Sequence, residues 1–198
     1  MANAIEIEAT VLLDEKEYAH IAKKIPFTKH VVPTNWYIDS KDRILARGAT
    51  RLGLRIRFIN GEYIFTLKAP LSEGLLEKEQ LLAPSEADAM IKDNVFPEGT
   101  VKDFLEILDI DISKLETLAK LETERLSAII GNFHIDLDKN SYLGRTDYEL
   151  EVDSDSLESA QREAKNILKG RKVEFNLRSK QTRALKALEE QQALAAKA

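Results

Sequence analysis

Alternating polar and apolar positions recur along this chain and predict strands with one charged face and one apolar face. At the start, Glu6, Glu8 and Thr10 alternate with Ile7 and Ala9. Successive side chains of a strand point to opposite faces, so the two glutamates lie side by side. Like charges at that separation repel each other unless a cation or water lies between them.

The same alternation predicts strands over residues 35–39, 75–81, 121–129, 132–138 and 148–153, and a hairpin over residues 52–70. The hairpin is expected to turn at Asn60-Gly61, because Asn-Gly is typical of a two-residue turn between strands. Polar residues from 139 to 146 predict a further turn. The charge on the polar face changes sign between strands. The charged positions are Glu6, Glu8, Arg55, Arg57, Lys68, Glu77, Glu79, Arg125, His134, Asp136, Asp138, Glu149 and Glu151.

Apolar residues at helical spacing predict four helical regions outside the strands. These are residues 14–24 with Asp14 as N-cap, an insertion at about 84–118 with Ser85 and Thr100 as N-caps, residues 157–168, and a C-terminal helix at about 179–195. Strands and helices in this order predict an α+β fold, and the length of 198 residues suits a single domain over residues 1–198.

Composition excludes several classes of protein. Apolar residues make up 43% and charged residues 32%, as in ordinary soluble globular proteins. The chain has no cysteine, which excludes disulfides, zinc-thiolate sites and thiol nucleophiles. A net charge of -5 argues against a general nucleic-acid binder. Since no signal peptide and no membrane-spanning apolar run are visible, we expect a cytoplasmic protein without a membrane partner.

Two arrangements of the strands fit this pattern. In a half-solvated sheet the charged faces point to water, which suits any one strand taken alone. Taken together, the charges are sorted by sign, which favours a closed barrel whose charged faces meet across a polar lumen. Buried ion pairs alone are a costly way to stabilise such a lumen, whereas a polyphosphate with a bridging divalent cation satisfies both signs. Mg²⁺ or Mn²⁺ suits this site because both prefer carboxylate and phosphate oxygens.

Two cations near the C-terminus could reach the mouth of this lumen. Lys180 and Arg183 share one face of the expected last helix, in its first turn, where the helix dipole disfavours cations. A solvated surface position remains the alternative for Arg183. Among the histidines, His134 shares a face with Asp136, and we favour a structural role for it over metal ligation.

These residues resemble the CYTH superfamily, also called triphosphate tunnel metalloenzymes, over almost the whole chain. The family's opening E-x-E-x-K looks like Glu6 and Glu8, with Thr10 in place of the lysine. Its R-x-R strand looks like Arg55 and Arg57. The other matching positions are Lys68, Glu77, Glu79, Arg125, Asp136, Asp138, Glu149, Glu151, Lys180 and Arg183.

The resemblance implies an eight-stranded antiparallel closed β-barrel, or tunnel, with helices packed outside. It also implies hydrolysis of a triphosphate compound, with inorganic triphosphate as the expected ligand and Mg²⁺ or Mn²⁺ as cofactor. The implied substrate-binding residues are Arg55, Arg57, Lys68, Arg125, Lys180 and Arg183. The implied metal ligands are Glu6, Glu8, Asp136, Asp138, Glu149 and Glu151, with Glu77 and Glu79 as further candidates. The implied catalytic residues are Glu6, Glu8, Lys68, Glu149 and Glu151.

Thr10 leaves other functions open. The missing ammonium group could cost about 3 kcal/mol of transition-state stabilisation, so a polyphosphate- or nucleotide-binding protein with little turnover is one alternative. Class IV adenylate cyclases belong to the same superfamily, so cyclase activity on ATP is another. In either case Arg57→Ala or Glu149→Ala is expected to abolish ligand binding or turnover with little loss of fold, because the apolar strand faces stay intact.

Overall fold

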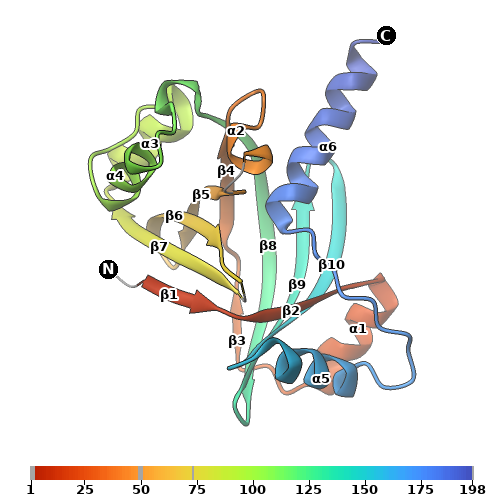
Figure 1. Ribbon diagram of the computed structural model, residues 1–198. Coiled ribbons are helices and arrows are strands. Elements are labelled where there is room, and N and C mark those ends of the chain that lie inside the picture. Colours follow the sequence, from red (N-terminus) through yellow and green to blue (C-terminus); the bar gives the residue numbers. More distant parts are fainter. Residues whose placement is uncertain (1–2, 49–50, 73, 198) are drawn as a thin grey trace.

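The structure is a computed structural model that describes residues 3–48, 51–72 and 74–197, and antiparallel strands form its centre (Figure 1). The strands are β1 (Asn3–Glu6), β2 (Glu8–Leu13), β3 (Lys29–Val31), β4 (Thr34–Asp39), β5 (Gly53–Ile59), β6 (Glu62–Pro70), β7 (Leu75–Leu82), β8 (Glu116–Ile130), β9 (Phe133–Tyr142) and β10 (Arg145–Asp153). The helices are α1 (Glu15–Lys24), α2 (Ile44–Arg47), α3 (Pro84–Asp93), α4 (Thr100–Ile107), α5 (Leu157–Ile167) and α6 (Lys180–Ala195), with a 3₁₀ turn, η1 (Ile112–Lys114).

The N-terminal segment closes these strands into a barrel. The hydrogen-bonded order is β1-β7-β6-β5-β4-β8-β9-β10-β2, and β3 pairs separately with β8. β1 pairs with β7 and β2 pairs with β10, and only Ile7 separates β1 from β2. The two ends of the order are therefore one continuous segment. Counting β1 and β2 as one strand and leaving out the short β3, eight antiparallel strands form the ring, as the resemblance implied.

A glycine permits the close approach at this junction. Gly74 precedes β7 and has a φ of +82°, and a Cβ at this position would collide with the carbonyl oxygen of Glu6. Because glycine has no Cβ and readily adopts positive φ, it lets the turn pass directly beside the first strand.

Two apolar clusters cover the outside of the barrel. In the first, Ile21 of α1 and Ala160 of α5 pack with Val11, Leu137 and Leu150 from the outer strand faces. In the second, residues of α3 and α4 pack on the opposite side of the barrel; its buried members include Met90, Leu105, Leu54, Ile56 and Phe65. These outer positions alternate with the charged positions, so the apolar cores lie outside and the charges point inward.

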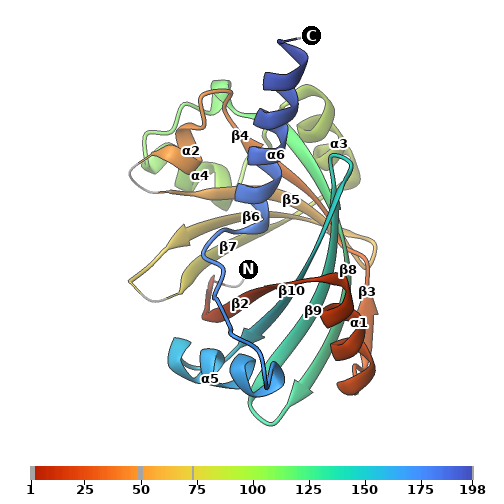
Figure 2. The ribbon, with the colours of Figure 1, turned by 90° about the vertical axis from the view of Figure 1, so that its right-hand side faces the viewer.

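The last helix, α6, packs against the inner side of the strands. Its residues Ala184 and Leu185 form a third cluster with Tyr37, Ala119 and Leu121 of β4 and β8. Tyr37 also lines the cavity of the barrel, together with residues of α6 itself. Figure 2 shows the first turns of α6 over the centre of the barrel. No helix in the described part of the chain has the length and apolar character needed to cross a bilayer.

The predicted helix starts in the insertion were wrong by one or two residues. The N-cap of α3 is Ala83 rather than Ser85, because Pro84 takes the first helical position, which suits its fixed φ. The N-cap of α4 is Gly99 rather than Thr100. Asp14 caps α1 as predicted, and its carboxylate accepts a hydrogen bond from the Glu17 N–H at 2.8 Å.

The strands of the second half are longer than the sequence predicted. A turn lies within the range expected, residues 139–146, but it is shorter than predicted, because β9 continues to Tyr142 and β10 starts at Arg145. Leu143 and Gly144, both at positive φ, make a two-residue turn. β8 begins at Glu116, inside the range expected for the helical insertion. This extra length brings Asn140 and Asp147 into the barrel wall beside the predicted site.

Candidate functional site

The barrel holds a cavity of about 730 Å³ between its inner strand faces and α6. Most of the predicted site residues line it, namely Glu6, Glu8, Arg55, Arg57, Lys68, Arg125, Asp136, Glu149, Glu151, Lys180 and Arg183. Asp138 and Glu77 lie directly behind this lining, where Asp138 contacts Lys180 and Glu77 contacts Lys68. Glu79 of β7 is opposite Thr66 of β6 and is not among the lining residues. The strand order thus gathers charges from distant parts of the sequence into one cavity.

The carboxylates of β9 and β10 form the acidic side of the cavity. They already pair with Arg125, Lys180 and Arg183. Arg125 bridges three acids, with nitrogens 2.5 Å from Asp136, 2.6 Å from Asp138 and 2.5 Å from Glu151. Burial lowers the pKa of Arg125, and the charges of these acids more than offset it, so the pKa lies well above its ordinary value. Arg125 of β8 is therefore held in place by acids of β9 and β10.

Lys180 is placed among a second set of acids. Its Nζ lies 3.0 Å from Asp138 and 2.6 Å from Glu151, and it also contacts Glu149. These three carboxylates offer oxygens within 4.8 Å of one another, a spacing suited to a metal ion. Burial lowers the pKa of Lys180, but the charges of Glu149 and Glu151 more than offset this effect. The pKa therefore lies well above its ordinary value, and the lysine stays charged. The ammonium group of Lys180 thus lies where a metal ion would fit.

Arg183 joins the same network from the first turn of α6, three residues after Lys180. Its Nε donates to Asp147 at 2.9 Å and its guanidinium also donates to Glu149 at 2.8 Å. Tyr142 donates its hydroxyl to Asp147 at 2.7 Å. Burial and the Asp147 hydrogen bond raise the pKa of Tyr142 to about 12. Sequence reasoning missed Asp147, although it lies two residues before Glu149 on the same strand face.

The opposite side of the cavity, formed by β5 and β6, carries positive charge with fewer partners. Arg57 donates to the Asn35 side chain at 3.1 Å, and no described carboxylate lies within 4.0 Å of it. Burial, followed by repulsion from Arg55, lowers the pKa of Arg57 to about 10. Arg55 is 3.8 Å from Glu77, and its buried Nε has no hydrogen-bond partner among the described residues. An anion in the cavity would stabilise both guanidinium groups.

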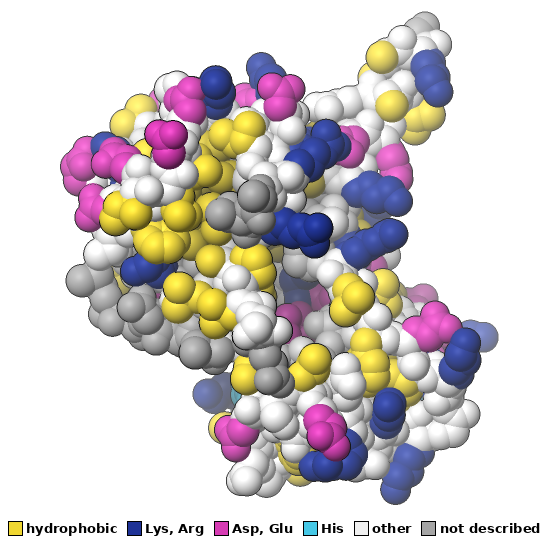
Figure 3. Space-filling model, in the orientation of Figure 1, with side chains coloured by type: hydrophobic (Ala, Val, Ile, Leu, Met, Phe, Trp, Pro, Cys, Tyr) yellow, Lys and Arg dark blue, Asp and Glu magenta, His cyan; other side chains and the backbone are white. Residues whose placement is uncertain are grey.

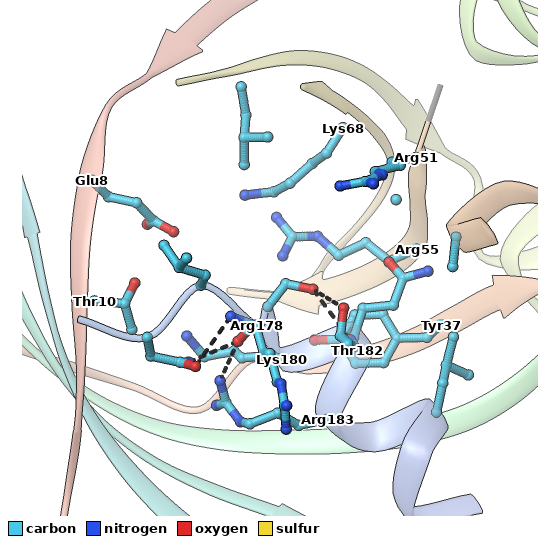
Figure 4. Close-up of a pocket in the computed structure, with 18 of the residues that line it drawn as sticks. Glu8, Thr10, Tyr37, Arg51, Arg55, Lys68, Arg178, Lys180, Thr182 and Arg183 are labelled. Atoms are coloured by element: carbon cyan, nitrogen blue, oxygen red, sulfur yellow. Dashed lines mark hydrogen bonds between the residues drawn. The ribbon is translucent and has the colours of Figure 1, made fainter. Parts of the chain in front are cut away.

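Lys68 connects the basic side to the N-terminal strand. Its Nζ lies 2.5 Å from Glu6 and 2.5 Å from Glu77. Figure 4 shows Lys68 and Arg55 across the cavity from Glu8 and Thr10. Thr10 pairs with Glu151 across β2 and β10, so a residue at position 10 faces the acidic network.

Glu6, Glu8 and Asp153 make a second candidate metal site, at the junction of β1, β2 and β10. Their carboxylate oxygens lie within 4.8 Å of one another, and Asp153 is directly opposite Glu8. The Oδ1 atom of Asp153 is buried without a hydrogen-bond partner, which suits metal ligation. Burial raises the pKa of Asp153 to about 6, and burial followed by the charge of Glu151 raises that of Glu8 well above its ordinary value. A divalent cation would relieve this crowding of negative charge.

The predicted metal ligands therefore do not form one cluster. Glu6 and Glu8 belong to the group with Asp153, whereas Asp138, Glu149 and Glu151 surround Lys180. Asp136 pairs with Arg125 and accepts a hydrogen bond from Ser127 at 2.5 Å. Sequence reasoning did not select Asp153, although it continues the alternation of Glu149 and Glu151 by one more step.

His134 holds a position between the acids of two strands. Its Nδ1 is 3.1 Å from Asp153 and its Nε2 is 3.6 Å from Asp136. The ring bridges the two carboxylates, an arrangement that can orient Asp153.

A family model, a curated relative and solved structures all resemble this chain. Residues 4–174 match the CYTH domain. A candidate triphosphatase of Bacillus subtilis, YjbK, is 36% identical over 156 residues, which are 78% of this chain and 80% of the relative. The crystal structure of a candidate adenylate cyclase from Bacillus halodurans superposes with a TM-score of 0.78 at 33% identity, covering 85% of this chain and 90% of that one.

A more distant structure shares the same fold. HpAC1 from Hippeastrum, described as a candidate adenylyl cyclase with a dominant triphosphatase activity, has a TM-score of 0.72 at 20% identity, over 94% of this chain and 96% of its own. Because the family match spans most of the sequence and the barrel is that of its relatives, this protein belongs to the CYTH domain family.

Proposed function

We propose that this protein is a divalent-metal-dependent hydrolase of triphosphate compounds, and that inorganic triphosphate is its substrate. The observation that carries the proposal is Arg57, a guanidinium group inside the cavity with no carboxylate partner among the described residues. Burying a charge without a counterion is costly. An anionic ligand would supply the missing partner, and three acids that suit a metal line the same cavity.

The phosphate groups would bind along the basic side of the cavity. Arg55 and Arg57 present their guanidinium groups to the same space, and such groups bind phosphate oxygens through two parallel hydrogen bonds. Lys68 contacts Glu6 and Glu77, and its ammonium group would also donate a hydrogen bond to the phosphate. These cations would neutralise the charge that grows on the phosphate oxygens during transfer.

The metal would bind to Glu6, Glu8 and Asp153. Their oxygen donors suit Mg²⁺ or Mn²⁺, and the partnerless Asp153 Oδ1 fits a ligand position. A bound divalent ion would supply electrophilic activation of the phosphate. Arg125, Lys180 and Arg183 would keep the neighbouring acids charged and fixed while the ligand binds.

Thr10 supports a second candidate, a protein that binds polyphosphate or a nucleotide with weak turnover. The threonine offers no positive charge at the position opposite Glu151. In this case the cavity would hold the ligand but stabilise the transition state less well.

Phosphate release separates these functions. Purified protein is incubated with tripolyphosphate, thiamine triphosphate or ATP, with Mg²⁺, with Mn²⁺ or with excess EDTA. Metal-dependent phosphate release that is fastest with tripolyphosphate supports the proposal. Tight binding of tripolyphosphate without release favours the binding protein, and cyclic AMP formation from ATP favours a cyclase.

A further inference from the structure

Four polar groups on one wall of the cavity are buried without a hydrogen-bond partner among the described residues. They are the Tyr37 hydroxyl, the Arg55 Nε, the Thr66 hydroxyl and the Gln181 Nε2. Tyr37 is 1% exposed and Thr66 is 0% exposed, so both side chains are closed off from bulk water. A buried polar group without a partner is costly, and native proteins keep few of them. This wall therefore needs an occupant that accepts hydrogen bonds.

The strand register brings three of these groups together. Arg55 of β5 is directly opposite Tyr37 of β4 on one side and Thr66 of β6 on the other. Residues directly opposite on antiparallel strands point to the same face, with Cβ atoms about 5 Å apart. Arg55 and Tyr37 line the cavity, so the face that they share with Thr66 is the inner one. Figure 4 shows Arg55 and Tyr37 pointing into the cavity beside the first turn of α6.

The fourth group comes from α6, and a glycine makes room for it. Gln181 is the second residue of α6 and lines the cavity. A Cβ at Gly53 would lie 3.1 Å from Gln181 Oε1, which is closer than an ordinary van der Waals contact. Gly53 and Arg55 are two residues apart on β5 and share the inner face. The Gln181 amide is thus held over the same wall, one step along β5 from the other three groups.

The chemistry of these groups indicates their ligand. All four can donate a hydrogen bond, and only Arg55 carries a charge. A terminal phosphate group suits such a set, because it offers three non-bridging oxygens within a small volume, whereas an internal phosphate offers two. Arg57, which has no carboxylate partner among the described residues, adds positive charge on the same strand. Figure 3 shows Lys and Arg side chains grouped beside the hollow of the molecule, which favours the approach of an anion.

We propose that Thr66 and Gln181 form, together with Arg55, a subsite for the terminal phosphate group of the substrate. The inference deepens the proposed function and rests on it, because it assumes that a triphosphate occupies this cavity. Thr66 and Gln181 are then specificity-determining residues, which distinguish a phosphate chain with a free end from a phosphate compound without one. Their role depends on strand register and on the docking of α6, so no local sequence pattern reveals it.

Calorimetry in excess EDTA, where a metal-dependent reaction cannot proceed, tests the subsite with two probes. Linear tripolyphosphate has terminal phosphate groups, whereas cyclic trimetaphosphate has three phosphates and no terminal group. The double variant Thr66→Val/Gln181→Leu removes both neutral donors with little change in side-chain size. It is expected to bind tripolyphosphate about tenfold more weakly than wild type, the effect of losing hydrogen bonds to a charged group. Wild type is expected to bind trimetaphosphate more weakly than tripolyphosphate, and the variant to lose none of that weaker affinity.

Denaturant unfolding of the same protein shows whether a loss of fold is responsible. Thr66→Val replaces a buried hydroxyl that has no partner among the described residues. Its free energy of unfolding is therefore expected to equal or exceed that of wild type. A clear loss of stability in Thr66→Val would show that the hydroxyl has a structural partner, which contradicts the subsite.

A matched control removes the same chemical groups elsewhere. Thr146 on β10 and Gln192 on α6 are exposed and lie outside the cavity lining, so Thr146→Val/Gln192→Leu is expected to bind both anions as wild type does. Equal weakening for both anions in Thr66→Val/Gln181→Leu overturns the subsite. Unchanged tripolyphosphate affinity also overturns it, because a permanently bound water is then the occupant of the wall.

The same titrations separate failure of the subsite from failure of the proposed function. If wild type binds tripolyphosphate and the Thr66→Val/Gln181→Leu variant binds it equally well, the subsite fails and the triphosphate site stands. If wild type binds orthophosphate but not tripolyphosphate, and the variant loses the orthophosphate, the subsite stands and the triphosphate site fails.

Discussion

Lys180 Nζ lies 2.6 Å from Glu151 Oε1, which joins the first turn of α6 to the inner face of β10. The lysine also contacts Asp138 and Glu149, so one ammonium group pairs with three nearby carboxylates. The C-terminal helix is thereby fixed to the barrel by charge as well as by its apolar face.

Lys180→Ala is expected to lower the free energy of unfolding by about 3 kcal/mol at neutral pH, because it leaves buried acids without their cation. Mn²⁺ should reduce this loss, since the three carboxylates can then hold a divalent ion instead. Denaturant unfolding with and without Mn²⁺ measures both effects. Lys186→Ala, an exposed lysine on the same helix, is the control, and a comparable loss there would contradict the prediction.

Thr10→Lys should rescue the Lys180→Ala variant. Residue 10 is opposite Glu151 on the neighbouring strand, so a lysine there can place its ammonium group beside the same acids. We expect the double variant to recover most of the lost unfolding free energy. Thr10→Ser in the Lys180→Ala background is the control. No recovery with lysine would show that the two positions do not share one charge environment.

Arg57→Ala and Glu149→Ala should separate function from stability. Arg57 has no carboxylate partner in the described residues, so its loss should weaken tripolyphosphate binding at least tenfold while stability stays the same or rises. Glu149 is fully buried and pairs with Lys180 and Arg183. The sequence alone led us to expect little loss of fold, but these buried ion pairs predict that Glu149→Ala destabilises the fold by about 3 kcal/mol. Calorimetric binding and denaturant unfolding of both variants provide the comparison. Equal destabilisation would refute the distinction.

Asp153→Asn should weaken Mn²⁺ binding about tenfold or more, because it removes one charged ligand of the group with Glu6 and Glu8. Electron paramagnetic resonance of free Mn²⁺ measures the affinity without reference to turnover. Asp155→Asn, an exposed acid two residues later, controls for the change in net charge. Unchanged affinity in Asp153→Asn would place the metal elsewhere.

Asp147 should contribute to stability in a pH-dependent way. Burial raises its pKa, but the hydrogen bonds and charge of Arg183 more than offset this, so the folded-state pKa lies below the ordinary value. A lowered acid pKa stabilises the fold above the unfolded pKa, near 3.9, and this stabilisation is lost as the pH falls toward the folded value.

Asp147→Asn should therefore lose less unfolding free energy than wild type on going from about pH 6 to about pH 3. Denaturant unfolding at several pH values gives this difference directly. Asp155→Asn, which leaves the network with Arg183 intact, should follow wild type. Parallel curves for wild type and Asp147→Asn would rule out the contribution.

The sequence determined the faces of the strands and therefore most of the cavity lining. Alternation with a period of two decides which side chains share a face, so Arg55 with Arg57 and Glu149 with Glu151 could be placed on the inner side from local pattern alone. The Asn60-Gly61 turn and the Asp14 cap were equally predictable, because each depends on a few neighbouring residues.

Only the tertiary structure decided which charges meet. Pairing of β1 with β7 and of β2 with β10 brings Glu6 to Lys68 and Thr10 to Glu151, and no local pattern contains that register. Docking of α6 decided that Lys180 lies among Asp138, Glu149 and Glu151, whereas Glu6, Glu8 and Asp153 form a separate group of carboxylates. Both outcomes depend on contacts between residues far apart in the chain, where packing and charge compensation of the whole barrel select the partners.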